Sequence, residues 1–231
     1  MRRTGRSGRK KANCRWASAE WTMMALLAVT RKLPWLHDAQ REERWITQSR
    51  ARYDGDSEVF GTRVMILGHG SIGQAVEQRL RCFEPEIVRV ARHAREGTHG
   101  VEDLEALLPE VDTVLIHLPE TDETRGIVDG RFLGLMKEGA ILINASRGAL
   151  VDNDALLEAL RAGRIRAAID NTDPEPLPDG HVLWSAPNLL ITPHVGSRSP
   201  RAHDRLTQLL YEQLERYVEG AALENVVEGA Y

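Results

Sequence analysis

Three side chains with complementary chemistry, Arg147, Glu175 and His194, each follow a short run of apolar residues in the sequence. An arginine fork can hold a carboxylate through two parallel hydrogen bonds. A histidine can exchange the proton of an alcohol while a hydride moves to or from a nicotinamide. A carboxylate beside the imidazole orients it and favours its charged form, which suits a proton donor. We therefore predict that these three residues are catalytic and act on a small acid that carries a hydroxyl or keto group.

The segment Gly68–Gly73 has the pattern G-x-G-x-x-G and lies between a candidate strand and a candidate helix, the context expected of a dinucleotide-binding loop. In such a loop the first glycine permits a tight turn, the second lets a pyrophosphate approach the backbone, and the third lets helix and strand pack closely. The helix N-terminus offers free N–H groups to the phosphates. The alternative is a glycine-rich turn without a ligand, and we expect His69 to be a spacer that points away. The predicted coenzyme contacts in this loop are Gly68, Gly70, Ser71, Ile72 and Gly73.

The residues after the second candidate strand bear on which coenzyme the loop would hold. NAD-binding folds usually place an Asp or Glu about 20 residues beyond the loop, where it bonds the ribose 2′-hydroxyl. This sequence has Ala91-Arg92-His93 there instead, with Arg89 and Arg95 nearby. Because a guanidinium can pair with a 2′-phosphate, we favour NADP(H), with Arg92 as its contact. The alternative is that these arginines form a solvated edge and that NAD(H) is also used.

Short apolar segments alternate with amphipathic ones from Phe60 onward, and this alternation predicts how the candidate residues are positioned. Continuous apolar strands that alternate with helices are typical of a parallel sheet covered on both faces. Ligands bind beyond the carboxyl ends of such strands, so the catalytic candidates and the glycine loop would share one edge. The predicted fold class is α/β, a Rossmann-type doubly wound parallel sheet. We expect strands at 63–67, 87–91, 113–118, 140–144, 165–170 and 189–192, and helices near 72–83, 102–108, 129–137, 153–162 and 200–219.

The residues before 60 have a different pattern. A helix capped by Ser18 is predicted to run to about Lys32 and to be apolar all round, which requires cover on both sides. We expect Pro34 to interrupt it, a helical pattern to resume over 35–45, and residues 46–58 to be a linker.

The composition is that of a soluble globular chain: 231 residues, 42% hydrophobic and 28% charged, with two cysteines that we expect to be free thiols. Residues 1–15 carry seven of the 30 Lys and Arg and none of the 34 Asp and Glu, which leaves a net charge of −11 on the rest. An acidic body argues against nucleic-acid binding, and no apolar run approaches the roughly 18 residues of a membrane span. For the basic start, 1–16, we favour disorder over a targeting segment or a nucleic-acid arm. The cysteine count favours a reducing compartment, and we expect the cytoplasm.

Taken together, the motifs resemble the D-isomer-specific 2-hydroxyacid dehydrogenases over about residues 17–231. The resemblance implies that Arg147 binds the substrate carboxylate, His194 is the general acid/base and Glu175 is its partner. The segment around Arg92 looks like the NADP-preferring hydroxypyruvate/glyoxylate reductase branch. The further coenzyme contacts implied are Leu118, Pro119, Thr124, Ala145, Asp170 (near the nicotinamide) and Gly196. The matching segments are 68–73, 117–119 (HLP), 124–126 (TRG), 144–152 (NASRGALVD), 168–178 (AIDNTDPEPLP) and 190–196 (LITPHVG).

The resemblance also divides the chain into segments. Residues 17–58 would be the interdomain helix and an arm that makes a homodimer, 59–196 the dinucleotide-binding domain, and 197–231 a C-terminal helix and tail that return towards the substrate domain. In the family most of the substrate domain precedes the interdomain helix, where this chain has only its 16-residue basic start. We therefore expect only a helical remnant of that domain, with apolar surface uncovered on helices 18–32 and 200–219. The tryptophans expected to add to this exposed surface are Trp21, Trp35 and Trp45.

The leading functional hypothesis is an oxidoreductase that transfers a hydride between NAD(P)H and a small 2-keto or 2-hydroxy acid of D configuration, mainly as a ketoacid reductase. The alternatives are a truncated, non-catalytic NAD(P)-binding remnant and a mis-started fragment of a longer dehydrogenase. An adenosylhomocysteine hydrolase-like enzyme would share the glycine loop but would not account for the order of Arg, Glu and His. The expected partners are the small acid and a second copy of the chain, without nucleic acid, membrane or metal.

Overall fold

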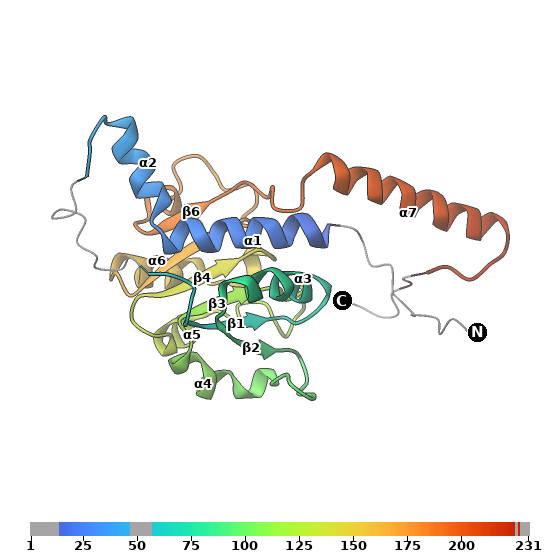
Figure 1. Ribbon diagram of the computed structural model, residues 1–231, viewed down its shortest axis with the longest axis horizontal. Helices are drawn as coiled ribbons and strands as arrows, with labels where there is room; N and C mark the ends of the chain where they lie inside the picture. Colours follow the sequence, from blue (N-terminus) through green and yellow to red (C-terminus); the bar gives the residue numbers. More distant parts are fainter. Residues whose placement is uncertain (1–13, 47–56, 225, 227–231) are drawn as a thin grey trace.

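The computed structural model describes residues 14–46, 57–224 and 226 of the chain. At its centre is a six-stranded, all-parallel sheet in the order β2-β1-β3-β4-β5-β6 (Figure 1). The chain winds from β1 to β2 on one side and from β3 to β6 on the other, so the switch point lies between β1 and β3. This is the doubly wound Rossmann-type sheet that the alternating pattern predicted. The strands are β1 Arg63–Leu67, β2 Glu86–Val90, β3 Thr113–Ile116, β4 Ala140–Asn144, β5 Ile165–Ile169 and β6 Leu189–Ile191.

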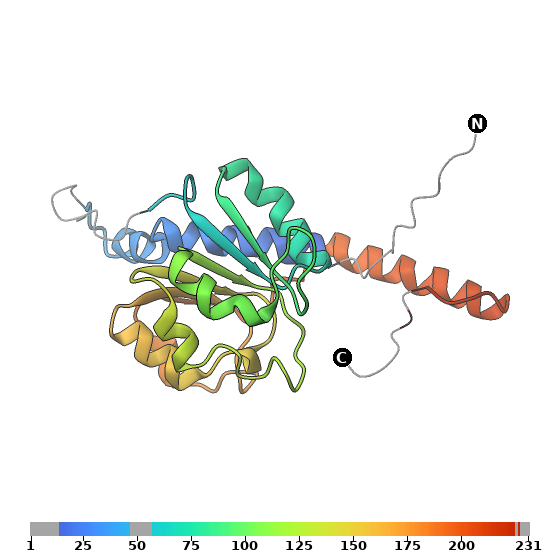
Figure 2. The ribbon, with the colours of Figure 1, turned by 90° about the horizontal axis from the view of Figure 1, so that it is seen from below.

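Helices cover both faces of the sheet (Figures 1 and 2). Successive residues of a strand point to opposite faces, so Met65 and Leu67 of β1 join one apolar cluster while Val64 and Ile66 join the other. The first cluster includes α4, α5 and α6, and the second includes α1 and α3. The bounds are α1 Arg15–Thr30, α3 Ser71–Leu80, α4 Leu104–Leu107, α5 Gly130–Leu135 and α6 Asn153–Arg161, with short 3-10 turns at Arg81–Phe83, Val101–Asp103, Leu108–Glu110, Gly148–Leu150 and Val182–Ser185.

The N-terminal helices differ from the sequence expectation in where they begin and end. Ser18 does not cap α1: its backbone N–H already donates to the Cys14 carbonyl, inside a helix that starts three residues earlier. Pro34 does not interrupt a helix either. It lies in the first turn of α2 (Leu33–Arg41), where the missing N–H has no partner to lose, and the break comes instead at Lys32 in a left-handed conformation. The basic residues 1–13 and most of the expected linker, 47–56, lie outside the described residues.

Helix α1 is covered on nearly all sides, as an all-round apolar helix requires. The expectation that Trp21 is exposed is wrong: the residue is only 7% exposed, because α1 packs against α3 and against strands β4 and β5. Trp45, by contrast, is 92% exposed and Trp35 is partly exposed.

The last helix, α7 (Pro200–Val218), extends away from the sheet and its flanking helices (Figures 1 and 2). Its side-chain cap is Ser199, whose hydroxyl accepts from the Ala202 N–H. A stripe of its apolar residues faces outward, as the sequence predicted for helix 200–219. The exposed members are Leu206, Leu210, Tyr211, Leu214, Tyr217 and Val218.

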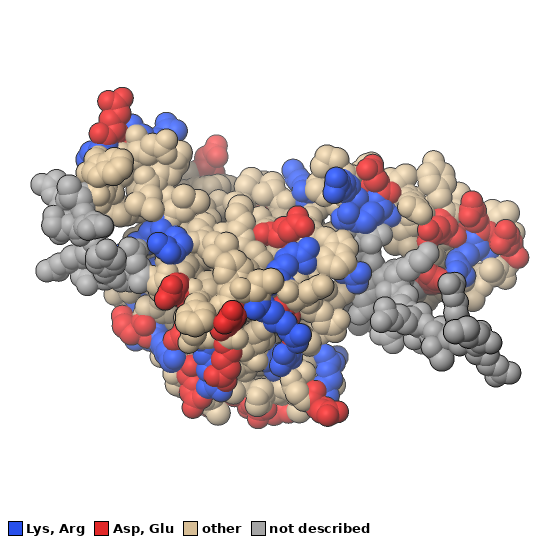
Figure 3. All heavy atoms as spheres, viewed as in Figure 1, with Lys and Arg blue, Asp and Glu red and all other residues tan. Residues whose placement is uncertain are grey.

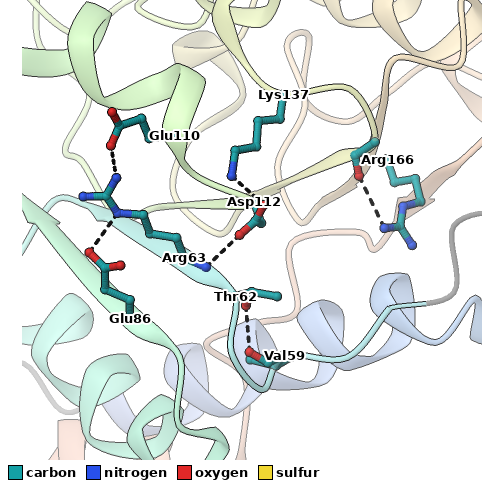
Figure 4. A network of polar contacts seen from close by, with 9 residues as sticks. Val59, Thr62, Arg63, Glu86, Glu110, Asp112, Lys137 and Arg166 are labelled. Atoms are coloured by element: carbon teal, nitrogen blue, oxygen red, sulfur yellow. Dashed lines mark hydrogen bonds and ion pairs between the residues drawn. The ribbon is translucent and has the colours of Figure 1, made fainter.

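Ion pairs and hydrogen bonds link charged side chains at the amino ends of the strands (Figure 4). The Arg63 side chain pairs with Glu110 and, at 2.8 Å, with Glu86. The carboxylate of Asp112 accepts from the Arg63 backbone N–H and from Lys137 Nζ, both at 2.8 Å. Burial acts to raise the pKa of Asp112, but these donors outweigh it and hold the pKa below its ordinary value. Asp112 and Lys137, whose charges are paired with each other, also line a small cavity at this edge.

Charged side chains of both signs are interspersed on the face of the molecule that Figure 3 shows. Basic and acidic groups lie next to one another there, both over the sheet domain and along α7. This mixture is typical of a solvated protein surface, in which opposite charges alternate.

Candidate active site

The glycine loop lies at the switch point between β1 and β3. Gly68 has φ of +103°, and a Cβ built on it would lie 2.4 Å from the carbonyl oxygen of His117, just beyond β3. A Cβ on Gly73 would lie 2.3 Å from the Gly68 carbonyl oxygen. Both positions therefore require glycine, the first for its dihedral angle and both for the close approach of backbone.

Gly70 lies between them, and the space beside its Cα where a Cβ would lie is free of other atoms. A Cβ there would meet nothing within 4 Å. Gly70 is also the N-cap of α3, and no side chain caps that helix. An open approach to an uncapped helix N-terminus is what a pyrophosphate requires, so these residues fit the dinucleotide that the motif predicts. Ser71 and Ile72 are the first residues of the helix.

His117 lies beside the loop, and its two ring nitrogens are buried without a hydrogen-bond partner among the described residues. Burial lowers the pKa of His117 from 6.5 to about 4, so the imidazole is neutral at pH 7. Its backbone N–H donates to the Leu67 carbonyl at 2.7 Å, which ties the ends of β1 and β3 together. In the sequence His117 belongs only to a motif, because nothing in the local pattern shows that its ring nitrogens are buried.

The three arginines near the end of β2 have different surroundings. Arg89 donates from Nη2 and Nε to the two carboxylate oxygens of Glu77 at 2.6 and 2.9 Å, and so lies against α3. Arg92, just past the strand, is exposed and donates to Glu123 at 2.6 Å. Arg95 is also exposed and donates to a backbone carbonyl of the glycine loop at 3.2 Å. Of these three arginines, Arg92 and Arg95 are therefore the exposed ones.

His194 and Glu175 are brought together beyond the carboxyl ends of β6 and β5. Nδ1 of His194 lies 2.6 Å from Oε1 of Glu175, and both side chains are partly exposed, at 37% and 43%. Nineteen residues separate them in sequence. The carboxylate fixes the orientation of the ring and leaves Nε2 as the nitrogen available to a substrate. This is the pairing that the sequence predicts.

Arg147 begins the segment after β4 and is exposed to solvent. Its Nη1 donates to the Ser146 carbonyl at 2.7 Å. Asn144 shapes this turn from below, since its amide donates to the Arg147 carbonyl at 2.8 Å and its side-chain oxygen accepts from the Ser146 N–H at 3.0 Å. The Ser146 hydroxyl in turn donates to the Ile116 carbonyl of β3 at 2.9 Å. The side-chain bonds of Asn144 stay within the turn, whereas the partner of the Ser146 hydroxyl is decided by the neighbouring strand.

Asp170 is buried where β5 ends, and its carboxylate is used within the protein. Oδ1 accepts from the Thr192 hydroxyl at 2.5 Å and from the Val195 N–H at 2.9 Å. Oδ2 accepts from the Gly196 N–H at 2.7 Å. Asp170 therefore anchors the segment that carries His194.

The remaining sequence candidates lie along the same edge. Leu118 is buried, and the Pro119 carbonyl accepts from the Thr124 hydroxyl at 2.7 Å. Ala145 is partly buried at the end of β4. In the described part of the chain, no group of three or more His, Cys, Asp or Glu side chains is placed to hold a metal ion. No helix there is long and apolar enough to cross a membrane.

Comparison with known proteins decides the family. A model of the D-isomer specific 2-hydroxyacid dehydrogenase NAD-binding domain matches residues 23–196. The chain belongs to this family. It is 37% identical over 195 residues to the D-3-phosphoglycerate dehydrogenase of Mycobacterium tuberculosis (strain ATCC 25618 / H37Rv), covering 82% of this chain and 36% of that protein. It is 35% identical over 226 residues to the glyoxylate reductase of Aeropyrum pernix, covering 91% of this chain and 66% of that protein.

Solved structures of the family have the same architecture. The TT0316 protein of Thermus thermophilus superposes with a TM-score of 0.83 at 37% identity, covering 94% of this chain and 70% of that one. A D-isomer specific 2-hydroxyacid dehydrogenase of Xanthobacter autotrophicus Py2, in complex with NADPH and MES, gives 0.77 at 33% identity, covering 94% and 88%. The chain is thus a Rossmann-type NAD-binding domain, and it spans about a third of the length of the phosphoglycerate dehydrogenases that it matches.

Proposed function

We propose that this chain carries the coenzyme half and the acid–base pair of an NAD(P)H-dependent reductase for small 2-keto acids, with D-2-hydroxy acids as products. The observation that carries this proposal is the 2.6 Å contact between His194 and Glu175 at the edge of the sheet that also holds the open glycine loop. A lone dinucleotide-binding domain does not need such a pair. The description of the family as 2-hydroxyacid dehydrogenases supports the same chemistry.

Each of the three residues has its own role in this reaction. Arg147 holds the substrate carboxylate through a bidentate pair, which places the adjacent carbonyl toward His194. A bound dihydronicotinamide supplies the hydride to the carbonyl carbon. His194 gives a proton to the carbonyl oxygen, so that the keto acid gains a hydride and a proton and becomes the alcohol. Glu175 stabilises the imidazolium before this transfer and keeps the ring oriented after it.

The test is oxidation of NADPH by purified 1–231 chain with a panel of 2-keto acids that includes glyoxylate and hydroxypyruvate. Substrate-dependent oxidation that His194→Ala abolishes supports the proposal. His37→Ala, an exposed histidine on α2, is the matched control and leaves the rate unchanged. Arg147→Ala raises KM for the keto acid and lowers kcat; unchanged kinetics would remove its role in binding the carboxylate.

The coenzyme preference is a finer part of the proposal. Arg92 is exposed beyond the end of β2, where a 2′-phosphate can displace its pairing with Glu123, and Ala91-Arg92-His93 itself contains no Asp or Glu. We therefore favour NADP(H), with NAD(H) as the second coenzyme. Arg92→Asp shifts the ratio of kcat/KM values from NADPH towards NADH. A ratio that does not move would assign the 2′-phosphate contact elsewhere.

A second function, coenzyme binding without turnover, is favoured by one observation. The matched region spans 36% of the phosphoglycerate dehydrogenases and 66% of the Aeropyrum pernix glyoxylate reductase, so part of each relative has no counterpart in residues 1–231. Tight NADPH binding measured by calorimetry, without oxidation by any keto acid, would support this function over reductase activity. The homodimer and the cytoplasmic location remain proposals, and sedimentation of the purified chain tests the first.

A further inference from the structure

We propose that Trp21 of α1 is a positioning residue for His194, acting through the Thr192 hydroxyl and the Asp170 carboxylate. The inference rests on the proposed function for the role of His194, but the contacts that carry it do not. They join the N-terminal helix to the segment 192–196, which we call the His194 segment.

The connection is a chain of two hydrogen bonds. The indole Nε1 of Trp21 donates to Thr192 Oγ1 at 3.0 Å, across 171 residues of sequence. That hydroxyl uses its own proton to donate to Asp170 Oδ1 at 2.5 Å. Trp21 and Asp170 are both buried. Because the hydroxyl accepts one bond and donates the other, the indole N–H sets which way the Thr192 proton points.

Asp170 then holds the backbone of the catalytic candidate and of the two residues that follow it. Its main-chain carbonyl accepts from the His194 N–H at 2.7 Å, and its carboxylate accepts from the Val195 and Gly196 N–H groups. These bonds retain His194 at φ of 51°, a left-handed conformation that few non-glycine residues adopt. With the backbone held in this way, Nδ1 of the ring meets Glu175.

The His194 segment also packs against the indole ring of Trp21. A Cβ added to Gly196 would lie 2.7 Å from Asp170 Oδ2 and 3.0 Å from Cγ of Trp21. The glycine is therefore clamped between the carboxylate and the indole ring. Trp21 thus contributes both a donor and a surface, and the two contributions can be separated by mutation.

Trp21→Phe keeps the apolar ring and removes the N–H, while Thr192→Val keeps the shape of Thr192 and removes the hydroxyl. Thr192→Ser retains the hydroxyl and is the rescue variant. Trp16→Phe is the matched control, because Trp16 lies on the same helix but its ring lies against the guanidinium groups of Arg15 and Arg79. A neutral hydrogen bond in a protein corresponds to about a three- to ten-fold change in an equilibrium.

We expect Trp21→Phe and Thr192→Val each to lower kcat by about three- to ten-fold, with KM for the keto acid and the affinity for NADPH changed by less than about two-fold. Amide hydrogen exchange at Val195 and Gly196 is expected to accelerate by a similar factor. Thr192→Ser retains most of kcat, and Trp16→Phe changes neither readout.

Two results would overturn the inference. One is a Trp21→Phe protein with wild-type kcat and wild-type exchange at Val195 and Gly196. The other is a loss of stability with exchange accelerated throughout α1 but not in the His194 segment, which would make Trp21 a core residue only. If the wild-type chain shows no reductase activity, the proposed function fails, while the exchange rates still decide the positioning role by the same two criteria.

Discussion

Glu77 is the group whose removal tests the electrostatics of this fold most directly. It lies on α3 with its side chain only 8% exposed, in contact with Arg89, with Arg81 Nη2 at 2.5 Å and with His69 Nε2 at 2.5 Å. His69, expected as a spacer, therefore has its ring against this carboxylate. The hydrogen bonds from Arg89 outweigh burial and, with those from Arg81 and His69, lower the pKa of Glu77 from 4.5 to about 2. The perturbation is Glu77→Gln, which keeps the shape and removes the charge.

The magnitude follows from that pKa. A fall from 4.5 to about 2 corresponds to about 3 kcal/mol of folding free energy, at about 1.4 kcal/mol per pH unit. The carboxylate binds its proton less tightly in the folded protein than in the unfolded chain. Its contribution is therefore complete above pH 4.5 and is lost as the pH falls from 4.5 towards 2. We expect Glu77→Gln to destabilise the protein by about 3 kcal/mol at pH 7, which is roughly 6–12 °C in Tm for a chain of this size.

The assay is urea unfolding followed by tryptophan fluorescence at pH 7, 4.5 and 3. Glu20→Gln is the control, because that carboxylate is 69% exposed and pairs with Arg79 only at 3.4 Å. We expect the control to change the free energy of unfolding by less than about 0.5 kcal/mol. A Glu77→Gln effect below about 1 kcal/mol at pH 7, or one of the same size at pH 7 and pH 3, would refute the reasoning.

Three further predictions concern single residues. The ring nitrogens of His117 are buried and its pKa is about 4 against 6.5 when unfolded, so the unfolded chain binds the proton first and stability falls as the pH drops from 6.5 to 4. His117→Gln is expected to flatten this slope in the same unfolding assay. A Cβ on Gly148 would lie 2.1 Å from the Thr172 carbonyl carbon, so Gly148→Ala is expected to lower Tm clearly. A Cβ on Gly134 in α5 would have no atom within 4 Å, so Gly134→Ala is expected to stabilise the protein by about 0.5–1 kcal/mol. Calorimetry that gives Gly148→Ala the higher Tm of the two variants would contradict this. Leu214→Glu on the exposed stripe of α7 is expected to leave the circular dichroism unchanged and to reduce association in light scattering, since the side chain is 58% exposed.

The sequence by itself was sufficient for the sheet and for the contact between Glu175 and His194. Buried parallel strands are continuous apolar runs, so all six strands could be placed within a few residues, although β3 ends at Ile116, short of the expected 118. The spacing in Gly68–Gly73 indicated a tight turn that begins at a glycine, and φ at Gly68 with the approach to His117 leaves no other residue type there. The pairing of Glu175 with His194 could be predicted because both residues follow neighbouring strands.

Tertiary structure alone decided which polar groups support those residues. The expected helix at 102–108 became two 3-10 turns around a four-residue α4, and the bond from Trp21 to Thr192 spans 171 residues. The spacing of residues likewise did not predict that Trp21 is buried. Nor did it predict that Arg89 pairs with Glu77 while Arg92 stays exposed. The physical reason is the distance along the sequence over which each interaction acts. Periodicity and backbone sterics act over a few residues and leave a local signal, whereas a hydrogen bond between distant side chains depends on how helices pack on the sheet.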